Sequence, residues 1–261
     1  MALYYKESGD RESQRVIVFL HGGGVGGWMW DGVTDYFQDS YCLIPDLPGH
    51  GRSAGEPFVS ISDTAAYLNR WIMDLAKGRE LVVAGFSLGA QILVEMLGQE
   101  PELMDYAIIN SVLTSPLPGA RVFTRPLIGL TFPLVRNRSF SRLQARTLYI
   151  SDADFEKYYE ECCRMEKETL LSILEENMSF KVPSGFKKAT ANLLVTVGEK
   201  EKSVMRRSVQ QLMSLQERAA GIMFPGVGHG VPLADPALFH RVVQRWLADG
   251  TIANEVIRVQ T

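Results

Sequence analysis

The pentapeptide Gly85-Phe86-Ser87-Leu88-Gly89 lies between a strand-like apolar run, residues 81–84, and a helix-like segment, residues 90–97. A serine on such a strand-to-helix turn is held in a strained backbone conformation that presents its hydroxyl at the top of a sheet. The flanking glycines suit the turn because it leaves no room for side chains two residues either side of the serine. The N-terminus of the following helix directs partial positive charge at the place where an oxyanion forms. This context predicts that Ser87 is a nucleophile.

Short apolar segments alternate with amphipathic segments along most of the chain, a pattern typical of a mostly parallel sheet wrapped by helices. Strands are predicted at residues 3–5, 16–20, 41–44, 81–84, 106–110, 193–197 and 221–224. Helices are predicted at residues 62–76, 88–98, 203–215 and 236–248, and Ser62 is suited to cap the first of them. We therefore expect an α/β fold with a mostly parallel central sheet flanked by helices.

Residues 115–188 interrupt this alternation with several prolines followed by charged, helix-like sequence. We expect them to form an inserted helical cap over the strand ends of a core made of residues 1–114 and 189–261. The second part of the insertion is acidic, whereas its first part carries arginines and no acidic residue: Arg121, Arg125, Arg136, Arg138, Arg142 and Arg146. One interpretation is that the two halves are solvated faces that pair with each other. The other is that one or two arginines face the pocket and hold an anionic substrate group.

The composition is that of a globular protein, and 261 residues are enough to bury one large α/β core. The formal net charge of −3 gives no reason to expect nucleic-acid binding. The three cysteines, Cys42, Cys162 and Cys163, fit neither a disulfide framework nor a zinc site, which favours a reducing compartment. Because the sequence shows neither a signal-peptide core at its start nor a long apolar span, we expect a cytoplasmic protein that does not bind membranes. Monomer and homodimer both remain open.

A serine nucleophile needs a base within hydrogen-bond reach. Of the four histidines, His229 is the strongest candidate because it lies in a glycine-rich loop, residues 224–230, between the last predicted strand and the last predicted helix. His21 opens a different loop, His50 lies in a turn, and His240 falls within an amphipathic helix. We therefore predict that His229 is the base.

The base needs an acid to orient it, and in this architecture the acid lies between the serine and the histidine in the chain. The segment that follows predicted strand 193–197 offers two carboxylates, Glu199 and Glu201. An ionised carboxylate at either position can fix the imidazole tautomer and stabilise the imidazolium formed during attack. The residues alone leave the two candidates open.

The glycine-rich loop at residues 21–27 follows predicted strand 16–20 and can bring backbone N–H groups close to a developing oxyanion. The expected donors are the N–H of Gly23 and the N–H of Leu88. A phosphate-binding loop is the rival interpretation, but the lysine and the glycine spacing of such loops are missing. Residues lining the substrate pocket are expected nearby at Gly24, Val25 and Trp28.

These motifs together resemble the α/β-hydrolase superfamily, and the resemblance covers nearly the whole chain outside the insertion. The motifs occur in the family's order: His21-Gly22, the turn at residues 46–53, the serine turn at residues 85–89, and Gly228-His229-Gly230. In this family the acid usually comes three residues after a glycine that ends its strand, which implies Glu201, although aspartate is commoner there. The resemblance implies a serine-nucleophile, carboxylesterase-like hydrolase that needs neither a metal nor an organic cofactor.

The resemblance implies cleavage of a small-molecule carboxylic ester, lactone or thioester through an acyl-enzyme, with a Ser-His-Glu triad. An alternative is hydrolysis or lysis of a carbon–carbon bond in an anionic metabolite held by the cap arginines. A third hypothesis, from a different class, is a receptor that keeps the fold and binds a ligand without turnover. The fold alone does not separate these three functions.

Overall fold

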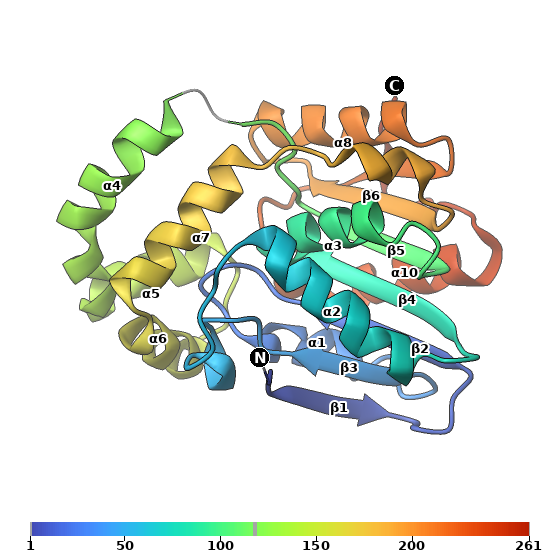
Figure 1. The fold of residues 1–261 in the computed structure, drawn as a ribbon, viewed down its shortest axis with the longest axis horizontal. Helices are drawn as coiled ribbons and strands as arrows, with labels where there is room; N and C mark the ends of the chain where they lie inside the picture. Colours follow the sequence, from blue (N-terminus) through green and yellow to red (C-terminus); the bar gives the residue numbers. More distant parts are fainter. Residues whose placement is uncertain (1, 117–118, 261) are drawn as a thin grey trace.

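The computed structural model describes residues 2–116 and 119–260, and its centre is one eight-stranded sheet (Figure 1). The strand order across the sheet is β1-β3-β2-β4-β5-β6-β7-β8. The six inner strands are parallel, and the edge strands β1 and β8 pair antiparallel with β3 and β7. The strands are β1 (Tyr5–Gly9), β2 (Arg15–Leu20), β3 (Tyr41–Pro45), β4 (Glu80–Phe86), β5 (Tyr106–Asn110), β6 (Asn192–Gly198), β7 (Ala219–Phe224) and β8 (Ile257–Arg258).

The inner strands are continuous apolar runs because both faces of the sheet are covered. In β2, Val16 and Val18 pack into one hydrophobic cluster, whereas Ile17 and Phe19 pack into a second cluster on the opposite face. Helices α2 (Ile61–Leu75), α3 (Leu88–Gln99) and α8 (Ser203–Leu215) bury apolar residues in the first cluster. Helices α1 (Asp31–Thr34) and α10 (Pro236–Asp249) bury theirs in the second, which gives three layers and confirms the expected α/β fold.

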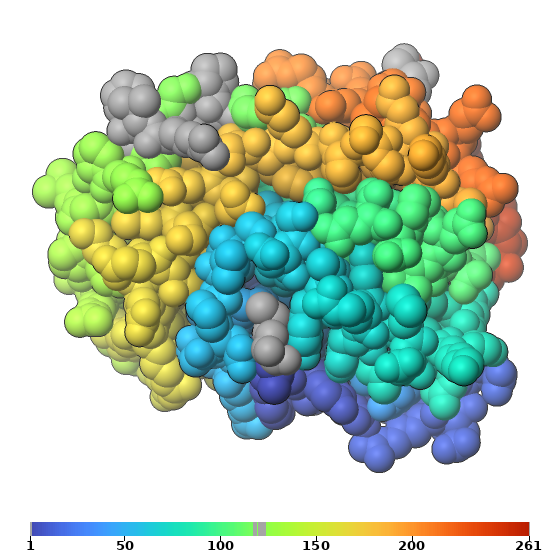
Figure 2. All heavy atoms as spheres, in the orientation of Figure 1, coloured from blue at the N-terminus to red at the C-terminus, as the bar shows by residue number. Residues whose placement is uncertain are grey.

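A group of helices between β5 and β6 lies beyond the carboxyl ends of the parallel strands (Figure 1). These helices occupy the stretch expected to be a cap, and we call them the cap helices. Figure 2 shows α7, in yellow, packed directly against the blue segment that precedes α2. The cap helices are α4 (Ala120–Thr131), α5 (Arg138–Thr147), α6 (Phe155–Arg164) and α7 (Lys167–Ser179), with the 3-10 turn η3 (Phe132–Arg136) after α4.

The basic and acidic halves of the cap helices pair with each other, as the first of the two interpretations proposed. Arg125 forms a salt bridge with Glu175, in which Nε lies 2.7 Å from Oε1. Arg138 pairs with Glu156, and Arg142 with Asp152. The side chain of Arg121 lies outside the described residues. Because these pairs lie on the surface, we expect each to contribute little stability.

Several predicted boundaries are wrong. The first strand covers the polar residues of Tyr5–Gly9 and not 3–5, because an edge strand with one exposed side needs no apolar run. The N-cap residue of α2 is Ser60 and not Ser62, because the Ser60 hydroxyl accepts a hydrogen bond from the Asp63 N–H at 2.9 Å. The Ser62 hydroxyl instead donates to Glu95. The two-residue β8 was not predicted. Within the described ranges, 2–116 and 119–260, no helix is both long and apolar enough to cross a bilayer.

Candidate active site

Ser87 occupies the sharp turn between β4 and α3 that its sequence context predicts. Its backbone angles are φ 53° and ψ −109°, a conformation that non-glycine residues rarely adopt. The two glycines are required by close backbone approaches. A Cβ on Gly85 would lie 2.4 Å from the Gly89 carbonyl oxygen, and a Cβ on Gly89 would lie 2.3 Å from the Leu20 carbonyl oxygen. The turn therefore holds the Ser87 hydroxyl at the carboxyl edge of the sheet.

His229 bridges Ser87 and Glu201. Its Nε2 lies 3.1 Å from the Ser87 hydroxyl oxygen, and its Nδ1 lies 2.8 Å from Glu201 Oε2. Of the two candidate acids, Glu201 is therefore the one that contacts the imidazole. Glu199 instead accepts a hydrogen bond from the Gly226 N–H at 2.7 Å, which holds the turn that leads to His229.

The Glu201 carboxylate is almost fully buried, with 3% of its side chain exposed. Its Oε1 accepts from the Ser111 hydroxyl at 2.7 Å and from the Gly198 N–H at 2.9 Å. Burial raises the pKa of Glu201, but the bond and charge of His229, the Gly198 N–H and the Ser111 hydroxyl lower it, and the net pKa lies below its ordinary value. At neutral pH the carboxylate is ionised and directs the Nδ1 proton of His229 toward itself.

Two residues that support this group were missed by the sequence analysis. Ser111, the first residue after β5, has φ 56° and donates to Glu201. Tyr149, between α5 and α6, accepts the N–H of Gly228 through its hydroxyl at 2.8 Å, so the cap helices contact the loop that carries His229. The position of Ser111 directly after predicted strand 106–110 could have indicated that it lies near the site. Nothing in the sequence around Tyr149 indicated its contact.

His21 orients the start of the glycine-rich loop after β2. Its Nε2 accepts the Leu47 N–H at 2.8 Å, so Nδ1 carries the proton and donates to the Gly22 carbonyl at 2.8 Å. Burial lowers the pKa of His21 to about 4, against the opposing effect of that carbonyl. The ring is therefore neutral at physiological pH, and its two hydrogen bonds hold the start of the loop in place.

His50 holds Gly24 of the same loop through a hydrogen bond. Its Nε2 accepts the Gly24 N–H at 3.1 Å and its Nδ1 donates to the Pro48 carbonyl at 2.9 Å. Burial, together with the neighbouring His21, lowers the pKa of His50 to about 3. Within the described part of the chain, the N–H groups of Gly23 and Leu88 have no acceptor. Both N–H groups are therefore free to donate to another acceptor.

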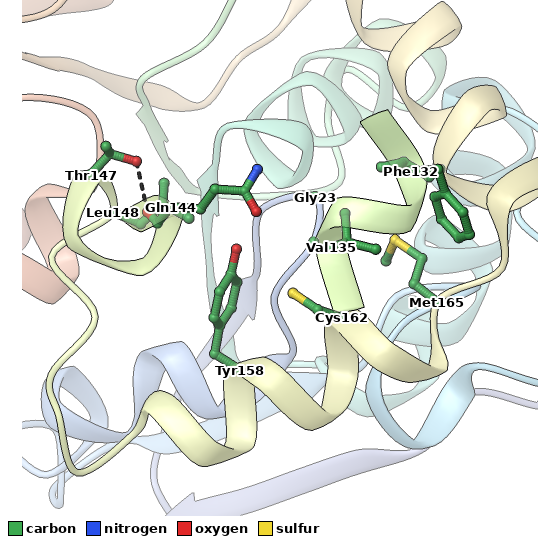
Figure 3. A pocket seen from close by; sticks show the side chains of 11 residues that line it. Gly23, Phe132, Val135, Gln144, Thr147, Leu148, Tyr158, Cys162 and Met165 are labelled. Atoms are coloured by element: carbon green, nitrogen blue, oxygen red, sulfur yellow. Dashed lines mark hydrogen bonds between the residues drawn. The ribbon is translucent and has the colours of Figure 1, made fainter. Parts of the chain in front are cut away.

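Two cavities flank this site. One, of about 250 Å³, lies beside Gly23 under the cap helices, and Figure 3 shows Gln144, Tyr158 and Cys162 turned toward its interior. The other, of about 350 Å³, contains Ser87 and His229. The first is lined by Gly23, Gly24, Phe132, Val135, Gln144, Thr147, Leu148, Tyr158, Cys162, Met165 and Leu170. The second is lined by Ser87, Ser111, Leu113, Asn177, Lys200, Glu201, Lys202, Met205 and His229.

The three residues expected to line the substrate pocket lie in different surroundings. Gly24 lines the cavity beside Gly23, but Val25 is buried in the core behind it. Trp28 points away, and its indole N–H donates to Glu161 on α6 at 2.8 Å. The loop turns at Gly24, with φ 80°. None of the arginines at 125, 136, 138, 142 and 146 lines either cavity, so the structure does not bear out the interpretation that these arginines face the pocket.

Helix α7 separates the two cavities. Leu170 lines one and Asn177 lines the other, and Ile173 lies between them on the same helix face. The Ile173 side chain packs over the oxyanion loop, with its Cγ2 3.3 Å from where a Cβ on Gly23 would lie. Gln91 of α3 exchanges two hydrogen bonds with Asn177, at 2.8 and 2.9 Å, and so fixes α7 to the core.

A protein-family model described as the alpha/beta hydrolase family matches residues 17–242, most of the chain. The chain belongs to the alpha/beta hydrolase family. It is 31% identical over 131 residues to an esterase from Mycobacterium tuberculosis, covering 49% of this chain and 43% of the relative. It is 24% identical over 238 residues to a pimeloyl-(acyl-carrier protein) methyl ester esterase from Klebsiella pneumoniae, covering 85% of this chain and 90% of the relative.

Solved structures agree on the fold. An esterase from Exiguobacterium antarcticum superposes with a TM-score of 0.77 at 17% identity, covering 94% of this chain and 95% of the other. At that identity the likeness establishes the fold alone. The chain spans less than half the length of several curated relatives that it matches, so the activity has to be argued from the site.

Proposed function

We propose that this chain is a serine esterase that hydrolyses small-molecule carboxylic esters through an acyl-enzyme. The proposal is carried by one observation: His229 lies 3.1 Å from the Ser87 hydroxyl and 2.8 Å from the buried carboxylate of Glu201. This is the nucleophile, base and acid arrangement of acyl transfer. The esterase names of two relatives support the same reaction.

In the proposed mechanism each group takes one step. His229 Nε2 takes the proton of the Ser87 hydroxyl as its oxygen attacks the ester carbonyl. The N–H groups of Gly23 and Leu88 donate to the resulting oxyanion. The His229 imidazolium, stabilised by Glu201, then gives its proton to the leaving oxygen, and the ester C–O bond breaks. A water molecule, deprotonated by His229, attacks the acyl-enzyme, and release of the acid restores Ser87.

The other two hypotheses have less support. Carbon–carbon bond cleavage was motivated by the cap arginines, three of which pair with carboxylates on the surface of the cap helices. A receptor without turnover needs no imidazole between Ser87 and Glu201, whereas His229 lies within hydrogen-bond distance of both. Lactones and thioesters remain within the proposal because they undergo the same acyl transfer. We also propose that residues 115–188 act as the cap that selects the substrate.

Initial rates with p-nitrophenyl acetate and butyrate test the proposal. We expect Ser87→Ala and His229→Ala each to lower kcat by about 10⁴-fold or more. The matched control is Ser62→Ala, which removes an exposed hydroxyl on α2 and leaves the rate unchanged. Wild-type turnover that survives Ser87→Ala at full rate contradicts the proposal.

A further inference from the structure

The two cavities on either side of Ile173 differ in charge. None of the described residues that line the cavity beside Gly23 carries a charge, and five of them are Phe132, Val135, Leu148, Met165 and Leu170. The residues that line the cavity containing Ser87 include Lys200 and Lys202. The site therefore offers an ester two chemically distinct compartments.

The proposed reaction decides which part of the ester enters which compartment. The leaving oxygen has to come within hydrogen-bond distance of His229 Nε2 to receive its proton. The leaving group therefore occupies the cavity that His229 lines. The carbonyl oxygen points at the N–H groups of Gly23 and Leu88, and from there the acyl chain extends into the uncharged cavity that Gly23 lines.

Lys200 and Lys202 have no carboxylate partner within residues 2–116 and 119–260. Neither carboxylate adjacent to them in sequence pairs with them: Glu201 bonds His229, and Glu199 accepts a hydrogen bond from the Gly226 N–H. Both lysines are exposed and flank Glu201 directly in the sequence. Unpaired ammonium groups at the mouth of a site attract and hold an anionic ligand.

The first two turns of α8 carry further positive charge. Arg206 and Arg207 follow the lysines, are exposed, and have no ion-pair partner in the part of the chain that the structure describes. The N-terminus of α8 also begins at Ser203, directly after Lys202, and contributes the partial positive charge of a helix start. The whole chain carries a formal net charge of −3, so this basic group contrasts with the protein as a whole.

We propose that the physiological substrate is an ester or thioester with an uncharged, mainly apolar acyl group and a leaving group that carries a carboxylate or phosphate. Lys200 and Lys202 bind that anion, and the cavity beside Gly23 binds the acyl chain. The anionic group that one of the two interpretations placed at the cap arginines is thus recognised by lysines of the core. This inference rests on the proposed esterase function and names its substrate class.

Paired aryl butyrates test the inference, with leaving phenols that bear a para carboxylate, a para phosphonate or a neutral para carboxamide. The readout is the ratio of kcat/KM for each anionic ester to that for the carboxamide. We expect the ratio to fall by roughly five- to tenfold in Lys200→Gln/Lys202→Gln, the summed effect of two exposed ion pairs. The matched control is Lys77→Gln, an exposed lysine that precedes β4 at the opposite end of the strand from Ser87.

A salt series on the wild type gives a second readout that needs no variant. Screening by 0.5 M NaCl lowers the ratio for the anionic esters if the lysines bind them. A ratio that responds neither to the double substitution nor to salt, while the carboxamide ester is still hydrolysed, overturns the inference and leaves the esterase function standing. Failure of the wild type to hydrolyse any of the esters overturns the function on which the inference rests. The larger of the two anionic ratios distinguishes carboxylate from phosphate.

Discussion

Replacing Glu201 by glutamine keeps the size of the side chain and removes its charge. Glu201 accepts three hydrogen bonds: from Ser111 at 2.7 Å and Gly198 at 2.9 Å on Oε1, and from His229 at 2.8 Å on Oε2. In Glu201→Gln the amide oxygen keeps the two donors at Oε1, which leaves the NH₂ group facing Nδ1 of His229. Because NH₂ is a donor, Nδ1 has to accept, and the ring proton moves to Nε2.

A proton on Nε2 prevents His229 from taking the proton of Ser87. Loss of the correct tautomer costs about 10⁴-fold in kcat in Ser-His-Asp enzymes, and we expect a loss of that order here. The assay is the initial rate with p-nitrophenyl butyrate, with the thermal midpoint measured to show that the variant is folded.

Glu199→Gln is the matched control. Its amide oxygen can still accept the Gly226 N–H, so we expect kcat to stay within about twofold of the wild type, as for surface substitutions that keep their contact. Two results refute the reasoning: a folded Glu201→Gln with more than a tenth of the wild-type kcat, or a Glu199→Gln that is more damaging than Glu201→Gln.

Three further predictions concern residues around the triad. Ser111→Ala removes a charge-assisted hydrogen bond worth about 1.5–3 kcal/mol, which lowers the pKa of Glu201 and holds its carboxylate, so we expect kcat to fall about tenfold or more; an unchanged kcat in the folded variant contradicts this. Ile173→Ala destabilises the fold by about 2–5 kcal/mol in urea titrations and raises the rate with pivaloyl relative to butyryl esters, because it opens space over Gly23; an unchanged ratio argues against the α7 partition. Burial raises the pKa of Glu161 to about 7 against the opposing bond from Trp28, so the folded state binds the Glu161 proton more tightly than the unfolded chain does. That contribution to stability is complete below pH 4.5 and is lost as pH rises to about 7; Glu161→Gln flattens this decline in the unfolding free energy, and equal slopes refute it.

The sequence analysis was most successful where local backbone geometry determines the residue type. The turn at Ser87 needs glycine at positions 85 and 89 because main-chain atoms lie within 2.4 Å of where their Cβ atoms would be. Such a requirement leaves a pattern within five residues. The inner strands could also be predicted from the sequence, because burial on both faces of the sheet requires unbroken apolar runs.

Contacts between segments far apart in the sequence could not be predicted. Glu199 and Glu201 lie two residues apart, and only the path of the His229 loop decides which one meets the imidazole. Ser111 is 90 positions from Glu201 in the chain, and Tyr149 is 79 positions from Gly228. The cap sequence showed its charges but not their partners, so the role of its arginines could not be decided before the ion pairs were seen.

Intact-mass analysis after treatment with a fluorophosphonate tests most directly whether Ser87 is an activated nucleophile. The account predicts one adduct on the wild type and on Ser62→Ala, and none on Ser87→Ala. It also predicts strongly slowed labelling of Glu201→Gln. The absence of an adduct on the wild type, or an adduct that persists in Ser87→Ala, contradicts the central claim.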